Sequence, residues 1–302
     1  MDPSRFGPWV SAEAQALFRA EADTARPAPG DVAAARAHYD AFNRGHLAVA
    51  RDHYPVDVVS AVMGGVPVDV VTPAAGATDG RTLICLHGGA FMWGRGAGAL
   101  LEAVPVAATA GLRVIAVAYA LAPEAVFPQA VEDVLAVYRA LRADRPAASI
   151  GIYGCSAGAI LTAQVTARAL AERIAAPGAI AMLCGAGLPM LGDSATAFGS
   201  TDAPALTDLP YFAGADPDDP LVFPGDHPAM LARFPPSLLV TGSRDFAASS
   251  VTTMHRRLRA AGVDASLLHF DGMWHAHHMA TTLPEARETF DALARFFCAH
   301  LT

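Results

Sequence analysis

A serine stands between small residues at 154–158, which read Gly-Cys-Ser-Ala-Gly, after the apolar stretch 150–153 and before a long Ala-rich and Leu-rich stretch. A strand, a sharp turn and a helix in this order expose a nucleophilic hydroxyl at the top of a sheet. The glycines allow a cramped turn, and the helix start directs N–H groups toward developing negative charge. We therefore predict that Ser156 is the nucleophile of an acyl transfer. The alternative is a helix-capping serine in an ordinary tight turn.

Backbone donors for the negative charge of such a reaction are predicted at residues 87–91, His-Gly-Gly-Ala-Phe, which follow the apolar stretch 83–86. Small residues let a substrate carbonyl approach the backbone N–H groups. We predict an oxyanion hole formed by the N–H groups of Gly88, Gly89 and Ala157, with Ala90 as an adjacent candidate. Each donor stabilises the transition state by roughly 3 kcal/mol. His87 is expected to be a structural hydrogen-bonding residue, and a plain turn is the alternative for the loop.

The base has to be selected from 11 histidines. His275 follows the apolar stretch 266–270 through the short loop 271–274, which places it at the carboxyl end of a strand. It also comes last in the order serine, acid, histidine that suits this kind of fold. His277 and His278 are rivals that lie farther from the strand end. We predict His275 as the base.

The acid has to lie between the serine and the histidine, on a loop after a strand. Asp245 meets both conditions, because it follows the apolar stretch that begins at residue 238. Its carboxylate would accept a hydrogen bond from the His275 ring and hold the tautomer. Asp219 has no apolar strand before it, and Asp271 has an ordinary explanation as a turn residue. We predict Asp245 as the acid.

Short apolar stretches alternate with helical patterns along most of the chain, and this alternation predicts the elements that position these residues. We expect an antiparallel hairpin at 56–62 and 66–71, strands at 82–86, 113–118, 149–153, 179–184, 237–241 and 265–270, and helices near 100–110, 128–143, 157–175, 249–261 and 284–300. Continuous apolar strands between helices predict a mostly parallel α/β sheet that is covered on both faces. Catalytic groups gather at the carboxyl ends of such strands.

Two segments stand apart from this alternation. Residues 1–52 read as helices at 11–22 and 31–52, separated by a Pro-rich and Gly-rich break, and are expected to be an appendage to the core. Residues 185–234 are rich in Pro, Gly and Asp, and they are too long for a plain connection in a compact domain. We predict a cap insertion at 185–234 and a catalytic core formed by 53–184 and 235–302.

Composition and charge limit the classes of molecule that the protein is expected to bind. The chain has 302 residues, 53% of them hydrophobic, and a net charge of −8 without basic blocks, so we expect a small-molecule substrate and neither nucleic-acid binding nor membrane insertion. The four cysteines lie far apart in sequence and imply neither disulfides nor a zinc site, and we predict no metal. The first 20 residues show no secretory signal, and the expected location is cytoplasmic.

Four separated motifs resemble those of the hormone-sensitive lipase family of α/β hydrolases, whose bacterial members are carboxylesterases. The motifs are residues 87–91, residues 119–124 (Tyr-Ala-Leu-Ala-Pro-Glu) with Phe127-Pro128, residues 154–158, and residues 272–275 (Gly-Met-Trp-His). The resemblance implies an α/β-hydrolase fold with a mostly parallel eight-stranded sheet, a helical cap to which residues 1–52 contribute, no cofactor and, in many members, a homodimer. The chain has Ala90 and Ala159 where the family has glycine, and Cys155 where the family has aspartate. The residues that follow Asp245 also differ from the family pattern.

The predicted function is a serine carboxylesterase that hydrolyses small to medium acyl esters through an acyl-enzyme on Ser156. Apolar side chains near the motifs are predicted to bind the substrate, with a plain core role as the alternative: Phe91, Trp93, Phe212 and Trp274, beside Met92 and Met273. A lactonase, amidase or peptidase would use the same triad. A non-catalytic receptor, like the plant gibberellin receptors that resemble this family, would lack a working triad, whereas His275 is present here. Cys155 is an alternative thiol nucleophile, although packing explains it better.

Overall fold

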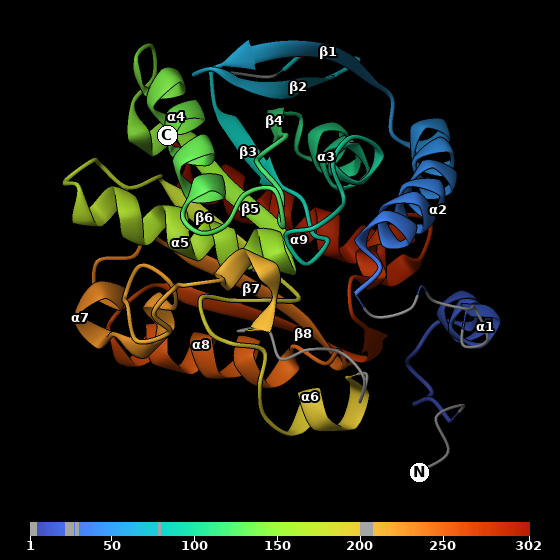
Figure 1. Cartoon of the computed structure of the whole chain (residues 1–302). Helices are drawn as coiled ribbons and strands as arrows, with labels where there is room; N and C mark the ends of the chain where they lie inside the picture. Colours follow the sequence, from blue (N-terminus) through green and yellow to red (C-terminus); the bar gives the residue numbers. More distant parts are fainter. Residues whose placement is uncertain (1–4, 22–26, 28–29, 78–79, 200–207) are drawn as a thin grey trace.

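An eight-stranded sheet forms the framework of the computed structural model, which describes residues 5–21, 27, 30–77, 80–199 and 208–302. Its strands lie in the order β1-β2-β4-β3-β5-β6-β7-β8 (Figure 1). They are β1 (Val56–Met63), β2 (Val66–Pro73), β3 (Thr82–Leu86), β4 (Arg113–Val117), β5 (Ile150–Cys155), β6 (Ala179–Leu183), β7 (Ser237–Arg244) and β8 (Ala265–Trp274). β2 is antiparallel to β1 and β4, and the remaining neighbours are parallel. The predicted fold class is confirmed.

Helices cover both faces of the sheet (Figure 1). Those described are α1 (Ala12–Glu21), α2 (Val32–His53), α3 (Ala97–Ala110), α4 (Gln129–Arg142), α5 (Ala157–Ala171), α6 (Asp193–Phe198), α7 (Pro228–Leu231), α8 (Ala248–Ala260) and α9 (Pro284–His300). Residues of α4, α5 and α8 share one buried apolar cluster, and residues of α3 and α9 share the other. The sheet separates these two clusters.

The central strands contribute alternate residues to the two clusters. In β3, Ile84 and Leu86 belong to the cluster under α4 and α5, whereas Leu83 and Cys85 belong to the cluster under α3 and α9. Both sets are fully buried, because a strand covered on both faces has no solvent side. This explains the continuous apolar runs in the sequence. The packing on both faces also fixes where each strand ends, and therefore where the residue after it lies.

The last strand is longer than the sequence predicts. Residues 271–274 were expected to form a loop, but β8 continues through them to Trp274, with a register shift opposite Gly242 and Arg244 of β7. A side chain at Gly242 would lie 2.2 Å from the carbonyl oxygen of Met273, so glycine is what lets the two strands stay this close. His275 therefore follows the strand directly.

The two segments outside the alternating pattern contain helices and turns. Within the described part of 185–234 the chain forms α6, α7 and 3₁₀ turns at Pro210–Phe212 and Pro224–Asp226. The N-terminal segment contacts the end of β8, where the indole N–H of Trp9 donates to Asp271 at 2.6 Å.

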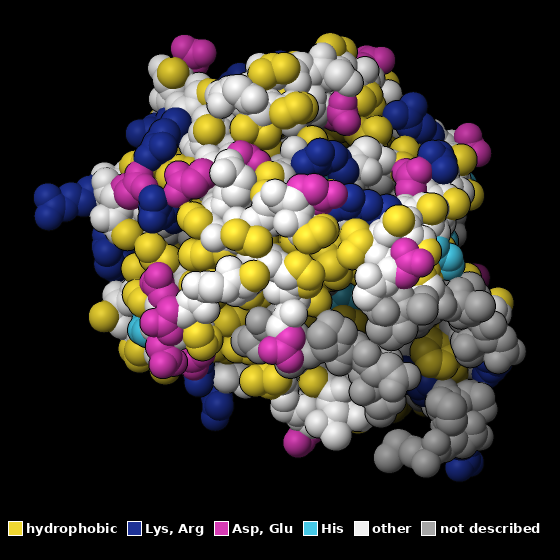
Figure 2. All heavy atoms as spheres, viewed as in Figure 1, with side chains coloured by type: hydrophobic (Ala, Val, Ile, Leu, Met, Phe, Trp, Pro, Cys, Tyr) yellow, Lys and Arg dark blue, Asp and Glu magenta, His cyan; other side chains and the backbone are white. Residues whose placement is uncertain are grey.

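Hydrophobic side chains occupy much of the middle of the face in Figure 2, and acidic and basic side chains are interspersed around them. In the described chain, no helix is both long and apolar enough to cross a bilayer.

Candidate active site

Ser156 lies at the turn between β5 and α5, in a backbone conformation that L-residues seldom adopt. Its φ of 56° falls in the left-handed region. The turn is possible because no side chain is present at Gly154 or Gly158: a Cβ at Gly158 would lie 1.8 Å from the carbonyl oxygen of Leu86, and one at Gly154 would lie 2.5 Å from it. The strained turn and the two glycines raise the Ser156 hydroxyl above the carboxyl end of β5.

Three residues from three strand ends form one hydrogen-bonded chain. Nε2 of His275 lies 2.9 Å from Oγ of Ser156, and Nδ1 of His275 lies 2.7 Å from Oδ1 of Asp245. In the tautomer with the proton on Nδ1, His275 donates to Asp245 and accepts from the serine hydroxyl. The structure thus brings together the three residues that the sequence predicts as nucleophile, base and acid.

Asp245 has no exposed surface, yet its carboxylate is fully hydrogen-bonded. Besides His275, it accepts from the N–H of Ala247 at 2.9 Å and from the hydroxyl of Thr241 at 2.8 Å. Burial alone would raise the pKa of Asp245, but the charge of His275 and these hydrogen bonds outweigh it and lower the pKa to about 2. The carboxylate is therefore ionised at neutral pH and can stabilise a protonated His275.

The rival residues do not take part in this hydrogen-bonded chain. His277 and His278 are buried beside the site and pack against Phe270 and Phe290, respectively. Asp219 accepts from the backbone N–H two residues ahead of it, and Asp271 accepts from Trp9 and Ser243. None of these four groups has a hydrogen bond to Ser156 or to the His275 ring among the described residues.

His87 has the structural surroundings expected of it. Its Nδ1 lies 2.7 Å from the carbonyl oxygen of Gly88, and the hydroxyl of Tyr119 donates to its backbone oxygen at 2.6 Å. The two rings are stacked with centroids 4.2 Å apart. These contacts hold the start of the 87–91 loop.

Because three histidines are buried, we expect the protein to become less stable as the pH falls. Burial lowers the pKa of His87 and His277 to about 4 and of His278 to about 3, whereas an unfolded histidine titrates near 6.5. The unfolded chain therefore binds these protons first, and the stability present above about pH 6.5 is lost as the pH falls toward 4. Each group removes about 1.4 kcal/mol per pH unit in that window.

We therefore expect the Tm to be clearly lower at pH 5 than at pH 7.5. In the His278→Gln variant, the Tm should change less steeply with pH. Replacing the exposed His53 by Gln is the matched control and should leave the slope unchanged. Scanning calorimetry across this range checks the prediction. A Tm that stays level between the two pH values would contradict it.

One of the predicted oxyanion donors, Gly88, has a hydrogen-bond partner inside the protein. The N–H of Gly88 is not free for a substrate, because it donates to the carboxyl Oε1 of Glu102 at 2.7 Å. Among the described residues, the N–H groups of Gly89 and Ala90 have no acceptor, and that of Ala157 belongs to the first turn of α5, where no intrahelical acceptor exists. Gly88 thus has a partner inside the protein, and the N–H groups left available at this place are those of Gly89, Ala90 and Ala157.

Two of the departures from the family pattern, Ala90 and Cys155, are accommodated in the structure. Ala90 adopts a φ of 51°, a left-handed conformation in which glycine would be less strained. Cys155 is buried, and the hydrogen bond of its thiol with Cys184 together with burial raises the pKa of Cys155 well above its ordinary value. A protonated, buried thiol is a poor nucleophile, so the geometry gives Cys155 a packing role.

The four predicted substrate-binding side chains are scattered. Phe91 has no exposed surface and stacks on Tyr211 with ring centroids 3.7 Å apart, and Phe212 packs against the edge of Phe91. Both therefore lie in the core and support the oxyanion loop instead of lining an open site. Trp274 is half-buried, with its ring 5.5 Å from that of Phe18 in α1.

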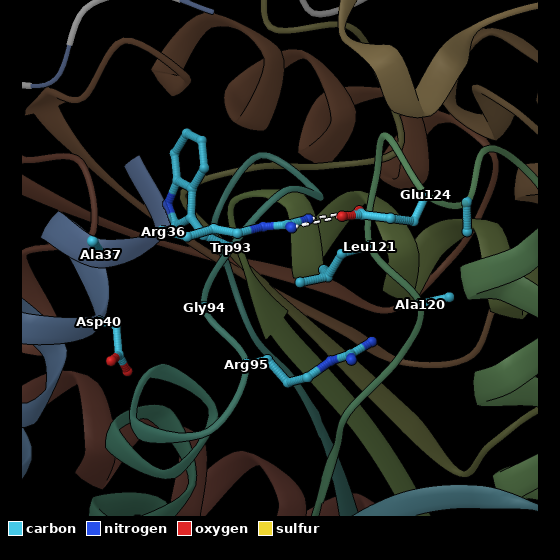
Figure 3. Close-up of a pocket in the computed structure, with 10 residues that line it drawn as sticks. Arg36, Ala37, Asp40, Trp93, Gly94, Arg95, Ala120, Leu121 and Glu124 are labelled. Carbon is cyan, nitrogen blue, oxygen red and sulfur yellow. Dashed lines mark hydrogen bonds and ion pairs between the residues drawn. The ribbon is translucent and has the colours of Figure 1, made fainter. Parts of the chain in front are cut away.

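Trp93, the fourth of these residues, lines a cavity of about 660 Å³ beside the oxyanion loop, between α2 and residues 93–95 and 120–125 (Figure 3). Arg36 crosses it and forms an ion pair with Glu124 at 2.7 Å. The same guanidinium donates to the carbonyl oxygens of Met92 and Ala122, so it ties α2 to the loop. Ser156 and His275 lie outside the segments that form the walls.

Two buried groups near the site were missed by the sequence reasoning. Glu102 lies inside α3 and contacts the oxyanion loop, and its position as the one charged residue of an otherwise apolar helix is the sequence signal that could have marked it as buried. Cys184 follows β6 and lies beside Cys155 and His278. The two cysteine sulfur atoms and a ring nitrogen of His278 lie within 4.8 Å of one another. Only the pairing of β5 with β6 brings the two cysteines together, because they are far apart in sequence.

Comparison with known proteins agrees with this geometry. A model of the α/β-hydrolase fold family matches residues 83–279, a range that contains Ser156, Asp245 and His275. The chain is 34% identical over 257 residues to LipR of Mycobacterium tuberculosis, to which an acetyl-hydrolase activity is ascribed, with 79% of each chain covered. It is 31% identical over 283 residues to an acetyl-hydrolase of Streptomyces hygroscopicus, covering 88% of this chain and 90% of that one.

A solved structure agrees over nearly the whole chain. The crystal structure of an esterase from the bacterial hormone-sensitive lipase family superposes with a TM-score of 0.81 at 25% identity, covering 96% of this chain and 97% of that one.

Proposed function

Because the chain belongs to the α/β-hydrolase family and is a carboxylic ester hydrolase, we propose that Ser156, His275 and Asp245 carry its reaction as nucleophile, base and acid. The observation that carries this proposal is the hydrogen-bonded chain from Oγ of Ser156 through the His275 ring to Asp245. Each member of the chain follows a different strand, β5, β8 and β7. Packing alone gives no reason for this convergence.

The geometry supports a two-step acyl transfer. His275 takes the proton of the Ser156 hydroxyl as the oxygen attacks the ester carbonyl, and the N–H groups of Gly89, Ala90 and Ala157 receive the oxyanion. The C–O bond of the leaving alcohol breaks, and His275 returns the proton to that alcohol. A water molecule, deprotonated by the same histidine, then hydrolyses the acyl-enzyme and releases the acid.

The substrates that we propose are acetyl and other short acyl esters. Two relatives that share about a third of their residues with this chain are named for acetyl hydrolysis. The core positions of Phe91 and Phe212 also favour a short acyl group, because these rings fill the space beneath the oxyanion loop.

A panel of p-nitrophenyl esters that differ only in acyl length tests the substrate class. We expect kcat/KM to be highest for acetyl to butyryl esters and to fall by about tenfold or more for the octanoyl ester, since even one methylene that a pocket cannot hold costs about this factor. Phenyl acetate, acetanilide and a γ-lactone serve as matched acyl compounds. A preference for long acyl chains, for the anilide or for the lactone would overturn the proposal.

Two further properties belong to the proposal. We propose a homodimer and a cytoplasmic location, both from the resemblance and the sequence composition. Light scattering coupled to gel filtration tests the first, and a monomeric mass at micromolar concentration would contradict it. Fractionation of the source cells tests the second.

A further inference from the structure

Glu102 is a carboxylic acid placed in the middle of an apolar helix. It is only 4% exposed, and its neighbours in α3 include the buried Leu101, Ala103 and Val104. A buried carboxyl group is costly unless hydrogen bonds compensate for the lost water. The contacts of this group therefore indicate what it does.

The carboxyl group of Glu102 contacts two backbone segments of the candidate site. Its Oε1 accepts the N–H of Gly88 at 2.7 Å, and the backbone of Cys155 lies close enough to the carboxyl group to lower its pKa. Gly88 directly precedes the proposed oxyanion donors, and Cys155 directly precedes Ser156. One side chain thus connects the oxyanion loop to the turn that carries the nucleophile.

The two backbone segments pack closely against each other at Gly88. A Cβ built on Gly88 would lie 3.2 Å from the carbonyl oxygen of Cys155 and 3.4 Å from Cβ of Ser156. The carboxyl group from α3 reaches the same place from the side, with its own Oε1 3.5 Å from that Cβ position. The hydroxyl of Tyr153 donates to the backbone oxygen of Glu102 at 3.1 Å and attaches this part of α3 to β5.

We propose that Glu102 is a positioning residue, which fixes the N–H groups of Gly89 and Ala90 relative to the Ser156 oxygen and so sets the geometry in which the oxyanion is bound. This inference rests on the proposed function of Ser156. It adds a group that touches neither the substrate nor the triad and acts through the two backbone segments.

The protonation state of the group does not decide this role. Burial raises the pKa of Glu102 to about 8, and the backbones of Gly88 and Cys155 oppose that shift. A carboxylic acid keeps a carbonyl oxygen that accepts an N–H, so the contact to Gly88 exists in both states. The amide oxygen of glutamine offers the same acceptor, whereas leucine offers none.

A positioning role predicts which kinetic constant changes. Oxyanion donors act on the tetrahedral transition state, and their effect depends steeply on their distance from the developing charge. Ground-state binding of the ester depends on them much less. Losing the acceptor of the Gly88 N–H should therefore lower kcat with little change in KM.

Three variants of the full chain test the inference. We expect Glu102→Leu to lower kcat for p-nitrophenyl acetate by about 100-fold, close to the loss of one oxyanion donor, with KM within about threefold. Glu102→Gln, which retains one acceptor oxygen, should recover most of that loss. Leu101→Met alters the packing of the same buried turn of α3 without touching Gly88, and should leave both constants unchanged.

A transition-state analogue supplies the readout that a structural defect would not give. The inhibition constant of a trifluoromethyl ketone should rise by the same factor by which kcat/KM falls in Glu102→Leu, and recover in Glu102→Gln. Equal losses in the Gln and Leu variants, or a lower kcat with an unchanged inhibition constant, would overturn the inference. If Glu102→Leu does not fold, Glu102→Asp replaces it, since the shorter side chain withdraws the acceptor, and a wild-type kcat in that variant would be equally decisive.

This design separates the inference from the proposed function. A wild-type enzyme without esterase activity would refute the proposed function itself. An active wild-type enzyme whose activity does not respond to Glu102→Leu would refute only the role of Glu102.

Discussion

Replacing Ser156 by alanine is expected to lower kcat for p-nitrophenyl acetate by a factor of about 10⁴ to 10⁶, because no oxygen remains to form the acyl-enzyme. The residual rate would come from the oxyanion hole and substrate binding. The fold should survive, since the only side-chain hydrogen bond described for Ser156 is that to His275. Steady-state kinetics and the Tm of the purified variant check both expectations.

The matched control for this variant is Cys155→Ala, which removes the thiol next to the nucleophile. That thiol is buried against Cys184, so its removal should leave the catalytic constants within about tenfold of the wild type. A Ser156→Ala enzyme that kept its activity, together with an inactive Cys155→Ala enzyme, would transfer the nucleophilic role to the thiol.

The second large effect is expected at the acid. Asp245→Asn should lower kcat by about 10⁴-fold, because an amide NH₂ facing Nδ1 of His275 favours the tautomer that carries its proton on Nε2. Nε2 would then no longer accept the serine proton. The N–H of Ala247 and the hydroxyl of Thr241 also lose a charged acceptor, so we expect a lower Tm as well.

Asp271→Asn is the matched control, since Asp271 lies four residues before the base and is the rival acid by sequence. At the surface it accepts from Trp9 on Oδ2 and from Ser243 on Oδ1, so asparagine keeps an acceptor oxygen for one of these donors and places its NH₂ against the other. We expect its kcat to stay within about threefold of the wild type, as for most surface substitutions. The reverse ranking of the two variants would show that Asp271 is the acid.

Much of the fold and the triad geometry could be predicted from the sequence because both depend on local patterns. Apolar runs between helical patterns identified the parallel strands. The order serine, acid, histidine then placed Ser156, Asp245 and His275 at three strand ends, where the structure joins them. Strand ends in a parallel sheet meet at one edge, so no knowledge of distant contacts was needed.

The features that were missed depend on packing between distant segments. Glu102 is 14 residues from Gly88, and only the docking of α3 on the sheet makes its carboxyl an acceptor for the loop. The same contact engages the Gly88 N–H, which the sequence alone cannot reveal. Phe91 and Phe212 were assigned to the pocket because sequence does not distinguish aromatic residues that line a site from those that support it.

The extra length of β8 was missed for another reason. Asp271 and Gly272 interrupt the apolar pattern and favour a turn, whereas pairing with β7 around Gly242 keeps the strand extended as far as Trp274. The outcome for the site is unchanged, since His275 still follows the strand.

Ser156 is expected to receive the acyl group of the ester, and trapping the acyl-enzyme is the most direct test of this role. The enzyme is mixed with p-nitrophenyl acetate, quenched in acid during turnover, digested and mapped by fragmentation mass spectrometry, with the Ser156→Ala variant processed in parallel. We expect one acetyl group on Ser156 of the wild-type peptide and none on the peptide of the variant. An acetyl group on Cys155, or steady turnover with no acylated residue in this peptide, would contradict the account.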